Sequence, residues 1–301
     1  MPADRRRAAG YTALAAAGSI WGTGFVFGEW ALAELSVAHM VLLRFVFASI
    51  GLAGALAYTS RKTPVRVAAA DWPTILVAAL IGVPVQYLMQ FGGLARTTVS
   101  HASLMVGVLP VLLGVAAAIF THERLDRIGW IGLVASTVGA ALVAFGGTGG
   151  DAPGRATLAG DALVVASLLG GVAWILMSQR LMARGYSSVA TSAIVIIVGT
   201  VMLAVWVLPR DGMPPLQALS TRAWLSLGAM GFLATAVATL LWNWGLARVP
   251  ASQAGVFINL EPVVGAILGV LLFRDVFGLA SIAGGVLIVL AAVIVSRRSP
   301  T

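Results

Sequence analysis

The sequence predicts an all-α integral membrane protein in which ten transmembrane helices form two five-helix repeats of inverted topology. Hydrophobic residues make up 59% of the 301 residues and charged residues only 10%, whereas a soluble domain carries about 25% charged residues. Apolar segments of about 20 residues, the length that spans a bilayer, follow one another along the whole chain. In addition, one half of the chain matches the other without a gap.

The expected spans are joined by short connections that hold most of the charges. The first segment has a basic start at Arg5–Arg7, as a signal peptide would. Because similar spans follow it, we expect a transmembrane helix rather than a cleaved segment. The ten expected spans are 10–30, 37–59, 73–92, 98–120, 128–146, 160–182, 188–209, 221–244, 250–273 and 278–296.

An internal duplication relates the fourth and ninth spans. Gly93–Pro110 reads GLARTTVSHASLMVGVLP, and Gly245–Pro262 reads GLARVPASQAGVFINLEP. A glycine-rich connector falls at the midpoint of the chain, where two copies would be joined. We therefore expect a first repeat at 1–147, a linker at 148–159 and a second repeat at 160–301, together forming one membrane domain.

The distribution of basic residues predicts the orientation. When the N-terminus is placed in the cytoplasm, most of the 19 Lys and Arg residues fall on the inner side, as the positive-inside rule requires. Both termini are then cytoplasmic, at the inner (plasma) membrane of a bacterium. Each repeat has an odd number of spans, so the second repeat enters from the opposite side. Inverted repeats around a site at the membrane midplane are frequent in secondary transporters.

Glu261 is the acidic residue expected deepest in the membrane, roughly at the bilayer centre. An ionised carboxylate at that depth is costly, so Glu261 is protonated, paired or hydrated in a cavity. It can couple transport to protons or bind a substrate amine. Alternatively, it can be a structural acid that binds backbone groups freed by Pro262. The first copy has Leu109 at the matching position, so the two repeats differ here.

Arg44 lies a turn or two inside the outer end of the second span. It can hold a substrate carboxylate, extend towards the lipid headgroups, or pair with Glu29 or Glu34. Each of these roles keeps the guanidinium away from the lipid tails, and the sequence leaves all three open.

Further polar and aromatic side chains are candidates for the lining of a substrate cavity. Gln86 and Gln90 are four residues apart and share a helix face beside Tyr87; they line a cavity or bond between helices. The tryptophans form an aromatic wall or simply pack. His101 is an interfacial residue or a proton relay. The candidates for the cavity lining also include Trp21, His101, Met105, Trp174, Asn243 and Asn259. The expected helix hinges are Pro84, Pro110 and Pro262.

Several function classes are excluded by what the sequence lacks. It has no cysteine and only 3 histidines, which are scattered, so we expect no metal site. No GxxxxGK[ST] motif is present, and we expect neither a cofactor nor enzymatic activity. The net charge of +8 is spread between apolar segments, so nucleic acid is not an expected partner. The expected partners are the lipid bilayer and a small-molecule substrate. Gly284 and Gly285 in the tenth span suit a packing seam or a homodimer.

Several short motifs resemble those of a known family. They are Trp21–Gly22, Leu43–Phe45, Leu109–Val111, Glu123–Leu125 and Glu261–Val263. On these motifs and the duplicated spans, nearly the whole chain resembles the drug/metabolite transporter superfamily, and its EamA-type members in particular. It departs from the family pattern at Arg274–Asp275 and Thr121–His122, which bear on local capping or gating.

The resemblance implies a carrier with a central cavity formed by spans 1–4 and 6–9, with spans 5 and 10 outside it. Members often export amino acids or other metabolites, and the aromatic and methionine content here is compatible with the YddG-like exporters of aromatic amino acids. We expect a secondary transporter that exports small metabolites, foremost amino acids, by alternating access. The alternatives are a passive channel or facilitator and a carrier of drugs, cations or other metabolites with the same fold.

Overall fold

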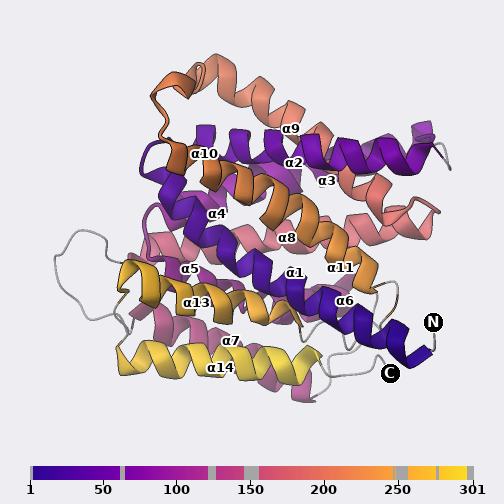
Figure 1. Ribbon diagram of the computed structural model, residues 1–301. Coiled ribbons are helices and arrows are strands. Elements are labelled where there is room, and N and C mark those ends of the chain that lie inside the picture. The colour runs from indigo at the N-terminus through magenta and orange to yellow at the C-terminus, as the bar shows by residue number, and fades with distance from the viewer. Residues whose placement is uncertain are drawn as a thin grey trace.

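The protein is a bundle of long helices that run side by side (Figure 1). All regular structure among the described residues is helical and no strand occurs there, which confirms the all-α prediction. Most of the expected linker lies outside the described residues, as do Glu123 and Ser252. The computed structural model describes residues 3–61, 65–120, 127–145, 156–246, 248, 257–275 and 278–296.

The first repeat supplies five spans, of which the third and fourth are each built from two helices. Their order follows the expected spans closely. The helices are α1 (Ala3–Leu32), α2 (Val37–Ser60), α3 (Trp72–Leu80), α4 (Gln86–Leu94), α5 (Val99–Val106), α6 (Leu109–Phe120) and α7 (Arg127–Phe145), with the short segments η1 (Ala69–Asp71) and η2 (Ile81–Val85).

The second repeat has the same plan. Among the described residues of both repeats, five long segments have the length and apolar composition to cross a membrane, and shorter apolar helices accompany them, which fits the ten-helix repeat fold. The helices are α8 (Leu158–Ala183), α9 (Ser188–Asp211), α10 (Thr221–Gly228), α11 (Ala238–Leu246), α13 (Leu260–Phe273) and α14 (Leu279–Ser296), with the short segments η3 (Leu216–Ala218) and η4 (Ala229–Val237).

The third and eighth spans each contain a π-helical segment at matching positions. Adding the repeat offset of 152 to Ile81 and Val85, the ends of η2, gives Leu233 and Val237, which lie in η4. In η2 the cause is Pro84, because proline lacks a backbone N–H and crowds the preceding turn. The expected bend of the third span therefore coincides with η2.

The fourth and ninth spans are both discontinuous. Gly107 and Val108 separate α5 from α6, and the helix geometry of the ninth span is interrupted at Asn259. Asn259 is Gly107 plus the offset of 152, so the break is shared by the two copies. In each copy it lies just before the proline, Pro110 or Pro262, that was expected to form a hinge.

The two repeats intertwine rather than folding as separate bodies. Helix α1 of the first repeat packs against α11 and α13 of the second, and α8 of the second packs against α4 and α5 of the first. The contact of α1 with α13 is close because Gly18 and Gly22 have no side chains. A Cβ on Gly22 would lie 2.7 Å from the carbonyl oxygen of Glu261.

Helices α7 and α14 pack against each other along one side of the bundle (Figure 1). A Cβ on Gly139 would lie 2.7 Å from the carbonyl oxygen of Gly284. A Cβ on Gly284 would in turn lie too close to the carbonyl oxygen of Gly139. Gly284, which the sequence assigns to a packing or dimer seam, therefore makes a contact within the chain. These two helices are the fifth and tenth spans.

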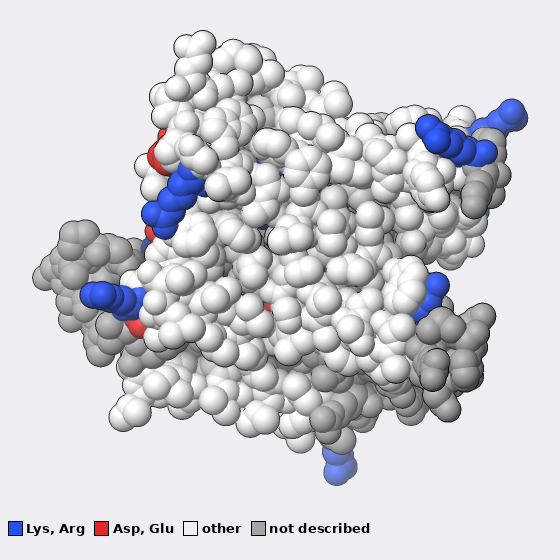
Figure 2. All heavy atoms as spheres, in the orientation of Figure 1, with Lys and Arg blue, Asp and Glu red and all other residues white. Residues whose placement is uncertain are grey.

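The bundle has two charged ends and an apolar middle. Helix α1 begins and α14 ends at one end (Figure 1), which we call the terminal end and which holds Arg61 and Arg184. The opposite, distal end holds Glu34 and Asp275. On the face shown in Figure 2, Lys and Arg side chains gather towards the two ends and leave a wide, almost uncharged band between them. Such a band fits the hydrocarbon core of a bilayer.

Candidate functional site

A cavity of about 260 Å³ lies in the centre of the bundle. Its lining comes from α1, α2, η2, α4, α5, α6, α8, α9, η4, α11 and α13, together with Ile258 just before α13. These are spans 1–4 and 6–9, the set that the family resemblance implies. Helices α7 and α14 contribute none of the described lining residues.

The structure brings most of the sequence-predicted site residues together around this cavity. It does not bring three of them there. Met105 is buried in the apolar core, Asn259 is buried at the break of the ninth span, and His101 pairs with a carboxylate of α8. Their expected place in the cavity is thus corrected. The predicted residues that line the cavity are Trp21, Arg44, Gln86, Tyr87, Gln90, Trp174, Asn243 and Glu261.

Arg44 enters the cavity from α2 and is only 4% exposed. Its Nε donates a hydrogen bond to the hydroxyl of Thr235 at 3.0 Å. The guanidinium carbon lies 4.6 Å from the ring centre of Tyr87 and 5.1 Å from that of Phe91, close enough for cation–π attraction. Neither Glu29 nor Glu34, the two acids considered as partners, forms an ion pair with Arg44 in the described structure.

Glu261 lies in the first turn of α13 and faces the same cavity. Among the described residues of the lining, Arg44 is the only base and Glu261 the only acid. Their charges attract each other, yet the two groups are not within the 4.0 Å of an ion pair. A basic and an acidic side chain therefore face the same cavity with room between them.

Tryptophans supply an aromatic wall from both repeats. The rings of Trp21 on α1 and Trp242 on α11 pack with their centres 5.2 Å apart. Trp174 on α8 lies directly against Gly82 of η2, where any side chain would overlap the indole. All three rings line the cavity, so it offers both apolar surface and cation–π faces.

Uncharged polar groups complete the lining. Asn243 of α11 donates to the hydroxyl of Ser192 on α9 at 3.1 Å. The hydroxyls of Ser178 and Thr191 are buried and have no hydrogen-bond partner among the described residues. Because buried polar groups are normally satisfied, these two hydroxyls are suited to bind a polar ligand or water in the cavity.

The cavity extends towards the terminal end of the bundle. Gln179 near the end of α8 is exposed, and Ser188 at the start of α9 is half-buried. On the distal side, the described lining stops at a layer that includes Phe25, Arg44 and Phe91. The rings of Phe25 and Phe91 pack against each other with centres 6.2 Å apart. Among the described residues, the cavity lining therefore reaches exposed side chains at the terminal end and ends at buried side chains on the distal side.

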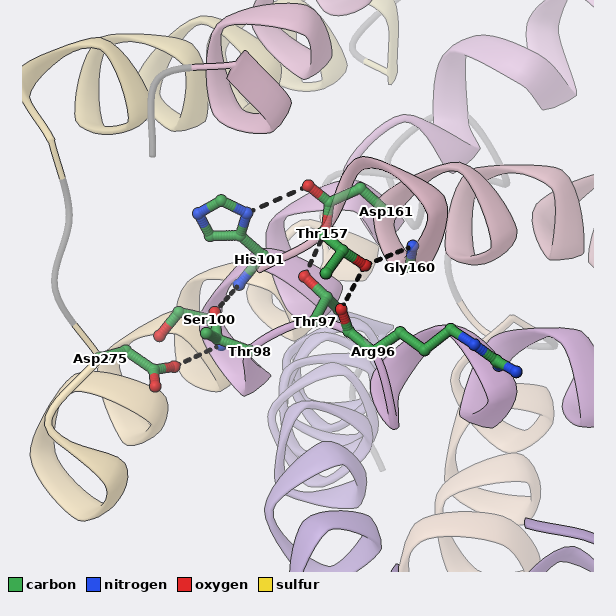
Figure 3. A network of polar contacts seen from close by, with 9 residues as sticks. All are labelled: Arg96, Thr97, Thr98, Ser100, His101, Thr157, Gly160, Asp161 and Asp275. Carbon is green, nitrogen blue, oxygen red and sulfur yellow. Dashed lines mark hydrogen bonds and ion pairs between the residues drawn. The ribbon is translucent and has the colours of Figure 1, made fainter. Parts of the chain in front are cut away.

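Two carboxylates hold the start of α5 at the distal end (Figure 3). Asp161, from the first turn of α8, accepts a hydrogen bond from Thr97 at 2.5 Å and lies 3.1 Å from Nδ1 of His101. On the other side, Asp275 after α13 accepts a hydrogen bond from the backbone N–H of Ser100 at 2.9 Å. Both acids come from the second repeat, so this network joins the two repeats where the cavity is closed.

Glu34 forms another distal contact, in the connection between α1 and α2. Its carboxylate accepts hydrogen bonds from the backbone N–H and the hydroxyl of Ser220, at 2.8 and 2.5 Å. These bonds hold the pKa of Glu34 below its ordinary value. Glu34 thus caps the start of α10 and does not pair with Arg44.

Sequence reasoning missed two polar residues that help to form this site. Thr235 holds Arg44, and Ser192 holds Asn243. The only sequence signal for Thr235 is that a polar residue lies inside an apolar span. The duplication gives no further signal, because the matching position of the first repeat is Val83. Small hydroxyl residues are common in membrane helices, so that signal is weak.

Comparison with known proteins identifies relatives along the whole chain. The model of the EamA-like transporter family matches twice, at residues 8–145 and 158–297. The uncharacterized transporter YetK of Bacillus subtilis is 23% identical over 98% of this chain and 90% of its own length. A probable terminal-alkyne amino-acid exporter of Streptantibioticus cattleyicolor is 25% identical over 93% of this chain and 90% of its own length.

The fold also matches a crystal structure with a TM-score of 0.66 and 19% identity, covering 96% of this chain and 97% of that one. The two family matches coincide with the two five-span repeats described above, and the curated relatives are named as transporters. The chain therefore belongs to the EamA-like transporter family, within the drug/metabolite transporter superfamily, and is a membrane transporter rather than an enzyme.

Proposed function

We propose that this transporter exports neutral amino acids from the cytoplasm of a bacterium by alternating access. The observation that carries the proposal is the placement of Arg44 and Glu261 in one cavity, apart from each other and surrounded by aromatic rings. An amino acid carries both a carboxylate and an ammonium group, and so matches both charges at once. The named relative that is a probable amino-acid exporter supports the same substrate class.

The substrate fits the cavity in one direction. Its carboxylate binds Arg44, whose guanidinium suits carboxylate geometry, and its ammonium group binds Glu261. The side chain then lies among Trp21, Trp174 and Trp242, which favours aromatic or other apolar side chains. A cavity of about 260 Å³ is smaller than the roughly 300–1,000 Å³ of sites for drug-sized ligands, as expected for a small metabolite.

The opening of the cavity at the terminal end supports export, because export requires that substrate enters from the cytoplasm. The positive-inside rule puts the terminal end in the cytoplasm, so the substrate enters the cavity from there. Separation of the distal contacts around Ser100 and Asp275 then opens the cavity to the outside. A passive channel would need both ends open together, and the closed distal layer favours a carrier.

A carrier of cationic drugs is the second candidate, favoured by Glu261 beside several tryptophans. In that case Arg44 would repel the substrate within the same small cavity. We therefore rank the amino-acid carrier first. A thermal-stability screen of the purified protein tests the ranking, because a ligand that binds the folded state raises its Tm. Neutral amino acids should raise the Tm and cationic drugs should not; the opposite pattern would contradict the proposal.

Glu261 is the proposed site of proton coupling. Replacing it by glutamine, as Glu261→Gln, keeps the shape of the side chain and removes its proton exchange. We expect the variant in proteoliposomes to lose the dependence of amino-acid uptake on the pH gradient. Glu29→Gln is the control, because Glu29 is not in the cavity lining. Unchanged pH dependence in Glu261→Gln would show that Glu261 does not couple transport to protons.

A further inference from the structure

We propose that Thr235 is a positioning residue that aims Arg44, so that a substrate carboxylate binds the two terminal nitrogens, Nη1 and Nη2, end-on. The inference rests on the proposed function, because it describes how the carboxylate of the substrate is held in the same cavity. It adds a residue and a binding geometry that neither the duplication nor the motifs indicate.

The first support is the hydrogen bond that the guanidinium already makes. Nε of Arg44 donates to the hydroxyl of Thr235 at 3.0 Å, and that hydroxyl in turn donates to the carbonyl oxygen of Met230 at 2.9 Å. The hydroxyl of Thr235 is therefore fixed as an acceptor towards Arg44. Thr235 itself is only 3% exposed, so water does not compete freely for this bond.

The second support is the set of rings around the guanidinium. Its central carbon lies 4.6, 5.1 and 5.7 Å from the ring centres of Tyr87, Phe91 and Phe45. Tyr87 and Phe45 also pack edge-on against each other with centres 4.7 Å apart. The guanidinium thus lies over the faces of these rings while its Nε donates to Thr235, and we infer that the end with Nη1 and Nη2 is the edge left for a substrate.

The fold delivers Thr235 to Arg44 through a close contact of η4 with α2. Gly231 of η4 lies against the backbone of α2 at Arg44 and Ala48, where a Cβ would lie 2.5 Å from the carbonyl oxygen of Arg44. Thr235 follows four residues later, one turn along, and its hydroxyl bonds five residues back to Met230. This side-chain bond lies within the π-helical segment η4, and such segments are frequent at functional sites.

The stereochemical consequence follows from the shape of the guanidinium. A carboxylate binds arginine with two hydrogen bonds either side-on, using Nε and one terminal nitrogen, or end-on, using both terminal nitrogens. Thr235 occupies Nε, so the side-on geometry is blocked. The end-on geometry remains, and it places the carboxylate on the extension of the Arg44 side chain, inside the cavity that Arg44 lines.

Equilibrium binding of three probes to the purified, full-length protein tests the inference. The probes are phenylalanine, 3-phenylpropionate, which lacks the ammonium group, and 3-phenylpropionamide, which lacks the carboxylate. The variants are Thr235→Val, which keeps the shape and removes the hydroxyl, and Thr235→Ser, which keeps the hydroxyl. Thr235→Ala serves if the valine variant does not fold, and Arg44→Lys removes the fork of donors.

We expect wild type to bind 3-phenylpropionate more tightly than the amide. Thr235→Val should weaken binding of both carboxylates by about tenfold, the effect of one misplaced hydrogen bond to a charged group. Binding of the amide should not change, Thr235→Ser should restore wild-type affinity, and Arg44→Lys should abolish the preference for the carboxylate.

Three results would overturn the inference. They are equal binding of the carboxylates by wild type and Thr235→Val, an equal loss for carboxylates and amide, and a wild-type protein without preference for the carboxylate. Failure of the proposed function looks different. In that case 3-phenylpropionate still binds in a manner that depends on Thr235, while phenylalanine is not transported.

Discussion

A single buried base and a single acid determine what the cavity can bind. Arg44 is almost fully buried yet forms no ion pair in the described structure, and Glu261 faces the same space. Unpaired charges inside a membrane are costly and typical of functional sites. The zwitterion of the proposed function would supply a partner to each of the two groups, and its binding would offset the cost of burying them in the empty carrier.

Trp174 and the glycine beneath it are expected to limit the size of the substrate side chain in the proposed function. In Gly82→Ala, the added methyl group overlaps the indole of Trp174 and displaces it into the cavity. Overpacking of this kind costs roughly 1–3 kcal/mol, so we expect the KM for phenylalanine to rise by about tenfold and the KM for alanine to change little. Uptake of both amino acids into proteoliposomes measures the difference.

The matched control is Gly54→Ala on α2, where a Cβ has no neighbour within 4 Å. That variant should transport both amino acids as wild type does. If Gly82→Ala changes the KM for phenylalanine and alanine by the same factor, Trp174 does not select the substrate by size.

At the residue scale, the sequence indicates charged residues better than small polar ones. Arg44 and Glu261 stand out because charges inside apolar segments are rare, and both line the cavity. Thr235 could not be found in this way, because its role depends on the contact of Gly231 with α2. His101 lies outside the described cavity lining and pairs with Asp161, a partner 60 residues away that the sequence does not indicate.

Short contacts at the distal end connect the helices of the two repeats. Asp275 holds the start of α5 through Ser100, and Glu34 holds the start of α10 through Ser220. The second of these contacts has a counterpart at the terminal end, where Tyr186 accepts a hydrogen bond from the backbone N–H of Ala68 at 2.9 Å. With the repeat offset of 152, Glu34 corresponds to Tyr186 and Ala68 corresponds to Ser220. The inverted repeat therefore places equivalent contacts at opposite ends of the bundle.

Weakening the contact of Asp275 should favour the outward-open state. Since the chain has no cysteine, Leu168→Cys in the cavity lining serves as a single reporter. We expect Asp275→Ala to raise labelling of this cysteine by a membrane-impermeant maleimide, added from the distal side, by roughly tenfold, because a hydrogen bond to a charged group is lost from the closed state alone.

Asp211→Ala is the control for that experiment, because Asp211 is an exposed acid at the distal end of α9. It should leave the labelling rate at the level of the Leu168→Cys parent. A rate in Asp275→Ala that equals the parent rate would show that this contact does not hold the distal end closed.

The contact of Glu34 should make stability depend on pH in a defined window. Its pKa is lowered in the folded protein by the bonds from Ser220, so the contact stabilises the protein above the unfolded value of about 4.3. That stabilisation is lost as the pH falls and the carboxylate becomes protonated. We expect Glu34→Gln to have a lower Tm than wild type at pH 7 and the same Tm near pH 3.

Thermal unfolding of the detergent-purified proteins across this pH range measures the effect, and Asp211→Asn is the control for an exposed acid. A difference between wild type and Glu34→Gln that stays constant from pH 7 to pH 3 would mean that the carboxylate charge contributes nothing through Ser220.

At the element scale, span positions could be predicted and their internal breaks only in part. The apolar length of most segments fixes their described ends to within a few residues, because the bilayer sets that length, whereas α1 begins seven residues before its expected start at residue 10. Pro84 signals the π-helical segment η2 through its missing N–H. No proline marks η4, although it lies at the matching place in the second repeat. The interruption at Asn259 is signalled only by Pro262, an expected hinge that follows three residues later.

The whole molecule combines an inverted repeat with intertwined packing. Its ten-span plan follows from composition and the duplication, and the family match covers both repeats. The packing of α1 on α11 and α13, and of α8 on α4 and α5, could not be predicted from one sequence, because it depends on contacts between distant segments. This packing places Arg44 of the first repeat and Glu261 of the second in one cavity.

The central claim is that this cavity carries neutral amino acids by opening alternately to the two sides. Counterflow in proteoliposomes tests it most directly, with vesicles loaded with unlabelled phenylalanine and diluted into a trace of labelled phenylalanine. We predict that labelled phenylalanine accumulates transiently above its equilibrium level, because a carrier exchanges substrate across the membrane. Entry only up to equilibrium, at a rate proportional to concentration and unaffected by the internal phenylalanine, would contradict the claim.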